Sequence, residues 1–128
     1  MTDSALVTDN LLQKYSLAVF DTLEWELMEE LPDCCTRNGD STMKFSLMAG
    51  DGFSAGTLAA WSCDRDGFTS ENIPVAEAAF ILEGVVRLTD AKTGEVTIVN
   101  TGEGYRLPAG WSGRWEALEP VRKIYILF

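Results

Sequence analysis

From residue 43 onward, glycine-rich turn signals recur about every ten residues and separate short runs rich in apolar residues, many of them β-branched or aromatic. The turn signals are Gly50-Asp51-Gly52, Asp64–Gly67, Glu83-Gly84, Thr93-Gly94, Thr101-Gly102 and Pro108-Ala109-Gly110. Between them we expect strands over 44–48, 57–61, 79–82, 85–89, 96–99, 113–118 and 121–127. Short strands at this spacing are typical of a sandwich or barrel, and no run has the sustained 3.6-residue period of a long helix. The pattern therefore predicts an all-β fold.

The first 43 residues differ in composition from the rest. They hold nine acidic and two basic residues, so -7 of the net charge of -10 lies there. Residues 23–28 alternate apolar and acidic, which predicts a half-buried strand, with a short amphipathic helix as the alternative. Residues 8–10 are typical of a helix cap, and residues 33–40 of a turn region. We expect one structural domain, in which an acidic extension over residues 1–43 packs on a barrel over residues 44–128.

The charge balance argues against two kinds of partner. Lys and Arg number 10 against 20 Asp and Glu, whereas nucleic acids and anionic membrane surfaces both require clustered basic residues. No apolar run approaches the roughly 18–20 residues of a membrane helix. Residues 1–4 lack the features of a signal peptide, and the odd set of Cys34, Cys35 and Cys63 suits a reducing compartment. We expect a cytoplasmic protein with no nucleic-acid or membrane partner, whose cysteines are free thiols, with a redox or nucleophilic role as the alternative.

The chain contains no histidine. Histidine is the commonest metal ligand and the commonest general base in proteins. Its absence excludes Ser-His-Asp and Cys-His nucleophilic catalysis, and it excludes zinc sites built from cysteine and histidine.

Three phrases in the second half of the chain resemble a known family. They are Phe80–Asp90 (FILEGVVRLTD), Leu107–Trp115 (LPAGWSGRW) and Glu119–Tyr125 (EPVRKIY), preceded by Glu77 at a spacing of seven from Gly84. In this order they resemble the cupin superfamily, and more closely its domain-of-unknown-function 861 branch (Cupin_3), which includes ureidoglycine aminohydrolase-like domains. The resemblance covers residues 57–128. It implies a single RmlC-like jelly-roll β-barrel, a homodimer, and a site inside the barrel mouth.

The sequence departs from that family at the metal site. The metal-binding pattern has three histidines and one glutamate, and only the glutamate is present, as Glu77. The first two histidine positions fall on Glu71 and Ile73, or on Ser70 and Asn72, and the third falls on Gly113. We therefore expect no metal and no other cofactor, and the manganese-dependent aminohydrolase activity of the resembling enzymes is not carried over.

The candidate site residues follow from strand alternation. Glu77 should point into the barrel on the same face as Ala79 and Ile81. Apolar surroundings suit a carboxyl group that acts as general acid or base, with Tyr105 or Tyr125 as hydroxyl partner. The candidate catalytic residues are therefore Glu77, Tyr105 and Tyr125, and the candidate ligand-binding residues are Trp61, Glu71, Ile81, Trp111 and Trp115.

Three functions remain open at this point. The first is the binding of a small organic molecule by aromatic walls with one or two polar anchors. The second is a metal-independent enzyme, of isomerase, lyase or cyclase type, that transfers a proton through Glu77; a Glu77 locked to a lysine or arginine would argue against it. The third is a carboxylate-based metal site that uses Glu77 and Glu71. For the basic pair before the last strand we expect Arg122 or Lys123 to contact Glu116 or Glu119.

Overall fold

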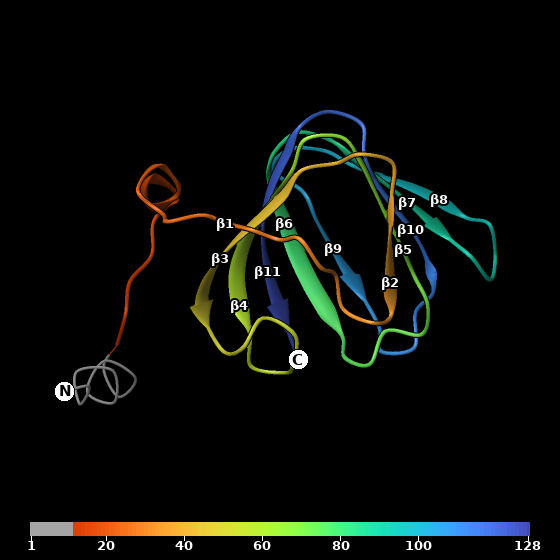
Figure 1. The fold of residues 1–128 in the computed structure, drawn as a ribbon, viewed down its shortest axis with the longest axis horizontal. Helices are drawn as coiled ribbons and strands as arrows, with labels where there is room; N and C mark the ends of the chain where they lie inside the picture. The colour runs from red at the N-terminus through yellow and green to blue at the C-terminus, as the bar shows by residue number, and fades with distance from the viewer. Residues whose placement is uncertain (1–11) are drawn as a thin grey trace.

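The computed structural model describes residues 12–128, which form two antiparallel sheets that face each other (Figure 1). The six-stranded sheet has the order β1 (Glu26–Leu27), β3 (Met43–Ala49), β4 (Leu58–Cys63), β11 (Val121–Leu127), β6 (Glu77–Glu83) and β9 (Gly104–Leu107). The five-stranded sheet has the order β2 (Cys35–Asn38), β5 (Asp66–Ser70), β10 (Gly113–Ala117), β7 (Val86–Asp90) and β8 (Val96–Val99). One short 3₁₀ helix, η1 (Leu17–Asp21), precedes them.

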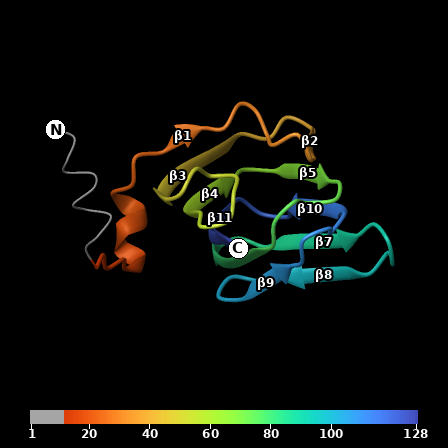
Figure 2. The same ribbon diagram turned by 90° about the horizontal axis from the view of Figure 1, so that it is seen from below.

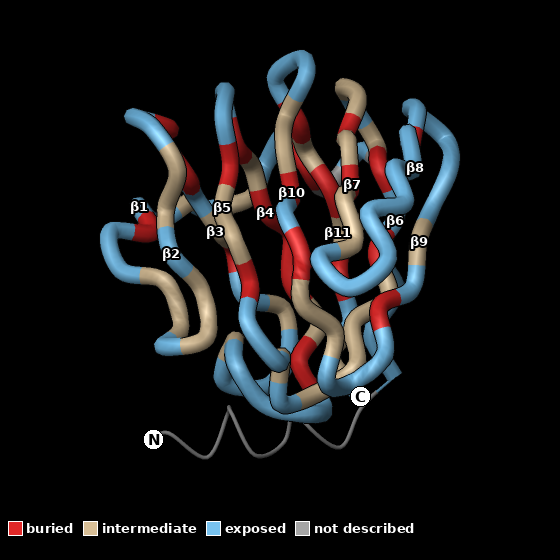
Figure 3. The backbone as a smooth tube through the Cα atoms, turned by 90° about the vertical axis from the view of Figure 1, so that its right-hand side faces the viewer, coloured by how far each residue is buried: buried red, intermediate tan, exposed pale blue. Residues whose placement is uncertain are grey.

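The core lies between the two sheets. Buried positions recur along the strands of both sheets (Figure 3), and they alternate with more exposed ones most regularly in β7, β10 and β11. Trp61 of β4 and Trp115 of β10 meet edge to face with ring centroids 5.0 Å apart, and Phe68 of β5 stacks on Trp115. These rings join the two sheets at the centre of the molecule.

The prediction of an all-β fold is confirmed, and strands occur in each of the seven ranges expected from residue 44 onward. In place of the expected closed barrel, the described residues form two separate antiparallel sheets, each of which ends in an edge strand, β9 in one and β8 in the other. Two further strands, β5 and β9, are additional to the prediction. Strand β5 begins inside the turn signal 64–67, where Asp66 and Gly67 take positive φ values of 56° and 154°. The last two residues of this turn signal are therefore the first residues of a strand, where the sequence predicted only a connection between two strands.

The expectation of a turn region over residues 33–40 is wrong in its centre, because Cys35–Asn38 pairs with β5 as strand β2. Pairing with a neighbour here outweighs the weak local preference of the sequence. Only Glu26–Leu27 of the expected strand at 23–28 is a strand, and it pairs with β3. The N-terminal third therefore adds one edge strand to each sheet (Figure 2).

The arginine of β2 ties this N-terminal region together. Arg37 donates hydrogen bonds to the carbonyl oxygens of Met28 and Ser41 at 2.8 and 2.7 Å. The helix cap expected at residues 8–10 lies outside the described residues. Within residues 12–128, no helix is both long enough and apolar enough to cross a membrane.

Candidate functional site

A cavity of about 130 Å³ lies between the two sheets. Its walls are mostly aromatic and aliphatic, and they include Trp61, Phe68, Trp111, Trp115 and Tyr125. The polar groups on the wall include the charged side chains of Glu77 and Lys123, the hydroxyl of Ser70, and the thiols of Cys34 and Cys35. Few polar groups on an apolar wall are typical of a small-molecule site.

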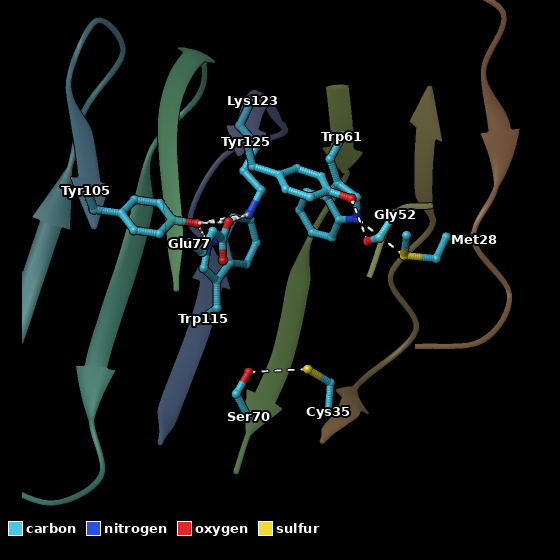
Figure 4. A network of polar contacts seen from close by, with 10 residues as sticks. All are labelled: Met28, Cys35, Gly52, Trp61, Ser70, Glu77, Tyr105, Trp115, Lys123 and Tyr125. Atoms are coloured by element: carbon cyan, nitrogen blue, oxygen red, sulfur yellow. Dashed lines mark hydrogen bonds and ion pairs between the residues drawn. The ribbon is translucent and has the colours of Figure 1, made fainter. Parts of the chain in front are cut away.

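The two charged side chains form a closed triangle with a tyrosine (Figure 4). Lys123 Nζ donates to Glu77 Oε2 at 2.8 Å and to the Tyr105 hydroxyl at 2.9 Å. The Tyr105 hydroxyl in turn donates to Glu77 Oε2 at 3.1 Å and accepts a bond from Trp115 Nε1 at 3.1 Å. Lys123 is only 3% exposed and the Glu77 side chain is 15% exposed, so this ion pair is largely buried. A buried charge pair requires supporting hydrogen bonds, and here the Tyr105 hydroxyl bonds to both partners.

Four aromatic rings surround the ammonium group. Lys123 Nζ lies 4.8 Å from the ring centroid of Trp61, 5.2 Å from that of Trp115, 5.4 Å from that of Tyr125 and 5.5 Å from that of Tyr105. A cation within about 6 Å of a ring face is attracted by the quadrupole of the ring. We call these four rings and the Glu77 carboxylate the lysine cage.

Strand alternation in β11 carries Lys123 into the cage. Val121, Lys123 and Tyr125 are buried, and the residues between them are more exposed. The same alternation turns Arg122 outward, where it forms an ion pair with Glu83. The pairing of β11 with β6 shifts register between Arg122 and Lys123, so that Arg122 lies opposite Glu83 and Lys123 lies opposite Ile81.

The expected cross-strand contacts of the basic pair are wrong, because neither residue contacts Glu116 or Glu119. Arg122 pairs with Glu83 and Lys123 pairs with Glu77. Glu116 instead forms ion pairs with two arginines. Its Oε2 lies 3.0 Å from Arg87 Nη2 and 3.5 Å from Arg114 Nη2. These arginines lie beside Glu116 on the outward face of the second sheet, where the register places Arg87 directly opposite it.

The surroundings of Lys123 and Tyr105 fix the protonation states of these two side chains. Burial alone would lower the pKa of Lys123, but the Glu77 carboxylate and the hydrogen bonds raise it well above its ordinary value. Burial, with the negative charge of Glu77, raises the pKa of Tyr105. At neutral pH Lys123 is therefore charged and Tyr105 is neutral. Burial also raises the pKa of Tyr125.

The residues present do not fit the metal ion that the cupin resemblance implies. Lys123 Nζ lies 2.8 Å from the carboxylate that would be the metal ligand, so a divalent cation would have to sit beside an ammonium group. Gly113 has no side chain to offer at the third histidine position. Residues 12–128 contain no group of three or more Cys, Asp or Glu side chains that could hold a metal. The positive charge at Glu77 comes from the chain itself.

The structure brings together most of the predicted site residues. Glu77, Trp61, Trp111, Trp115 and Tyr125 line the cavity. Tyr105 joins the site through its hydroxyl.

Two of the predicted ligand-binding residues do not line the cavity. Ile81 is fully buried beside Lys123 on the neighbouring strand, and Glu71 is exposed and lies outside the cavity. Glu71 follows the end of β5, where the chain has left the sheet. Lys123 is the central residue that sequence reasoning missed. Its signal was present, because Lys123 shares the inward parity of Val121 and Tyr125.

Comparison with known proteins agrees with the resemblance seen in the sequence. The profile described as the EutQ-like cupin domain matches residues 48–125, which is more than half of the chain. This chain belongs to the EutQ-like cupin family. The resemblance to the cupin superfamily and its domain-of-unknown-function 861 branch is thereby confirmed. A comparison with curated proteins finds no match.

Solved structures of three other proteins are similar to this chain. A domain-of-unknown-function 861 protein from Thermotoga maritima has 35% identity, with a TM-score of 0.50 over 54% of this chain and 76% of its own. A putative ethanolamine utilization protein Q from Salmonella typhimurium has 23% identity, with a TM-score of 0.50 over 68% of this chain and 69% of its own. A protein of unknown function from Rhizobium leguminosarum has 17% identity, with a TM-score of 0.59 over 92% of this chain and 97% of its own. The last two show the fold alone.

Proposed function

We propose that this EutQ-like cupin binds a small, uncharged organic molecule in the cavity between its sheets. The observation that carries the proposal is the lysine cage on the cavity wall. The cage presents aromatic surface and one carboxylate oxygen while its two charges cancel each other.

The size of the cavity limits the ligand. An engineered protein cavity of about 150 Å³ with apolar walls holds a benzene molecule. The cavity here measures about 130 Å³, so it suits a body of about six carbon atoms or fewer. The rings of Trp61, Trp111 and Phe68 supply flat apolar contact for such a body.

The electrostatics of the cage limit the charge of the ligand. Glu77 Oε2 accepts bonds from Lys123 and Tyr105, and no group among residues 12–128 donates to Glu77 Oε1. A hydroxyl group of the ligand would donate the hydrogen bond that Glu77 Oε1 lacks. An ionic ligand would leave water without finding an unpaired counter-charge, which costs several kcal/mol. The same pairing argues against the metal-independent enzyme, because Lys123 holds Glu77 in a fixed ion pair.

Three probes that share a cyclohexane ring test this proposal. Cyclohexanol, cyclohexylammonium and cyclohexanecarboxylate carry a neutral, a cationic and an anionic polar group on that ring. We expect cyclohexanol to bind with a dissociation constant on the order of 1 mM and the two ions to bind at least tenfold more weakly. Amide chemical shifts in nuclear magnetic resonance measure the affinities. Equal affinities for the three probes would contradict the proposal that the ligand is uncharged.

A pair of matched variants locates the binding. Val75 lines the cavity, and Val96 is an exposed residue of the edge strand β8. Val75→Phe should fill the cavity mouth and abolish cyclohexanol binding, whereas Val96→Phe should leave it unchanged. Binding that survives in folded Val75→Phe would place the probe elsewhere and overturn the proposed site.

We also propose that two copies of the chain associate through the outer face of the six-stranded sheet. The register places Ile124 beside Phe80, and Ile126 beside Ala78 and Leu58, which makes one continuous apolar patch. Phe80 is 55% exposed and Ile126 is 44% exposed. An apolar sheet face packs on the same face of a second copy that is related to it by a two-fold axis. Such an interface uses one patch twice, so it needs no complementary patch elsewhere on the molecule.

Light scattering tests the association. We expect a mass of twice the 14.1 kDa of one chain for the native protein and for the control Val96→Glu. Phe80→Glu places a charge at the centre of the patch and should give 14.1 kDa. A native mass of one chain, or an unchanged dimer in Phe80→Glu, would refute the proposed interface.

A further inference from the structure

Two adjacent cysteines line the same cavity, and the lysine cage does not use them. In a regular strand, neighbouring side chains point to opposite faces. Cys34 instead lies in the turn before β2, where Cys35 N donates to Pro32 O at 2.8 Å. This turn brings both sulfur atoms to the cavity wall, 3.6 Å apart.

The pair is held in place by the second sheet. Cys35 Sγ lies 3.3 Å from Ser70 Oγ of β5 (Figure 4), and Glu71 N donates to the carbonyl oxygen of Cys34 at 2.8 Å. Both cysteines are half-buried, so the sulfur atoms are positioned but can still be reached. The third cysteine, Cys63, is buried at the far end of β4, where its thiol bonds to Arg65 O.

We propose that Cys34 and Cys35 form a dithiol site that captures a trivalent arsenical at the wall of the cavity. The ligand class is an arsenic(III) compound with two exchangeable hydroxyl groups, such as hydrated phenylarsine oxide. Each thiol forms one As–S bond, its proton leaves with one arsenic hydroxyl as water, and two waters are released per arsenic. No electron is transferred, so the step needs no oxidant.

The chemistry of the pair fits this class of ligand better than it fits redox cycling. Burial raises the pKa of Cys35 to about 11, so its thiol is protonated at neutral pH. Oxidation proceeds through a thiolate, and Cys35 supplies little of it at neutral pH. The exchange of two neutral thiols for two hydroxyls consumes no free thiolate overall. The neighbouring aromatic walls can take the phenyl ring, since the cavity is close to the size that holds benzene.

Native mass spectrometry with phenylarsine oxide tests the site. We expect one arsenical per native chain and at least tenfold weaker binding in Cys34→Ser and in Cys35→Ser. Cys63→Ser keeps the pair intact and should bind like the native chain. Addition of 2,3-dimercaptopropanol should remove the arsenical, as it does from a chelating dithiol.

Three results would overturn the dithiol site. They are binding that is unchanged in folded Cys34→Ser, binding that is lost in Cys63→Ser, and an adduct that resists the competing dithiol. Thermal unfolding of each variant shows that it is folded. The outcome is separate from that of the cyclohexanol titration, because a cavity that rejects cyclohexanol can still present the two thiols. Binding of inorganic arsenite shows whether the phenyl ring contributes, and we expect weaker binding without it.

Discussion

Lys123→Met is expected to lower the free energy of unfolding by about 3–5 kcal/mol, because it leaves the Glu77 carboxylate in a buried site without its counter-charge. Methionine keeps a similar length and an apolar stem, so the change removes mainly the ammonium group. Chemical denaturation followed by tryptophan fluorescence measures the effect. Because the folded-state pKa of Lys123 lies above its unfolded value, this contribution is fully present below about pH 10.4 and is lost only as the pH rises through the folded pKa.

The neighbouring residue supplies a matched control. Arg122 occupies the same strand and also forms an ion pair, but Glu83 and Arg122 lie on the exposed face. Arg122→Met should cost no more than about 1 kcal/mol. The double variant Lys123→Met/Glu77→Gln should be about 1–3 kcal/mol more stable than Lys123→Met alone, because the orphaned charge is gone. Equal losses in Lys123→Met and Arg122→Met would show that the cage is not a buried ion pair.

Gly84→Ala is expected to cost about 3–5 kcal/mol, which combines an unfavourable backbone conformation with a steric collision. Gly84 connects β6 to β7 with φ of +90°, and an added Cβ would collide with the carbonyl oxygen of Pro120. Backbone cannot move aside as a flexible side chain can. Thermal and chemical unfolding of the variant measure the loss.

Gly94 is the control for the conformational part of that loss. It has φ of +74° in the turn between β7 and β8, and an added Cβ would meet open space. Gly94→Ala should therefore cost only about 1–2 kcal/mol. Similar losses at the two positions would mean that the approach of Pro120 to Gly84 does not matter for stability.

The strands could be predicted from sequence because each has a local signature. Period-two alternation and glycine turns are written within a few residues, and strands such as Val96–Val99 and Val121–Leu127 appear where they are expected. Strand Cys35–Asn38 has no such signature. It exists because β5 lies alongside and offers its free edge, and a sequence does not display its partners.

The candidate site also contains some residues that the sequence predicts and some that it does not. The inward positions of Glu77, Trp61 and Trp115 follow from alternation and from the cupin phrases. The partner of Glu77 was missed because Lys123 was grouped with Arg122 as a basic pair expected to contact Glu116 or Glu119. Strand alternation separates the two residues, turning Arg122 outward to Glu83 and Lys123 inward to Glu77. Glu71 was predicted to bind ligand because the motif spacing places it at a histidine position of the family. Spacing that is counted across a turn does not fix the direction in which a side chain points.

The ammonium at the centre of this protein is attached to the chain by covalent bonds. It is present at one equivalent in every molecule as soon as the chain folds, and no chelator can strip it away. Nor does its presence depend on how much manganese or iron a cell can acquire. In the folded chain the Glu77 carboxylate is therefore already paired with a charge that the chain itself carries.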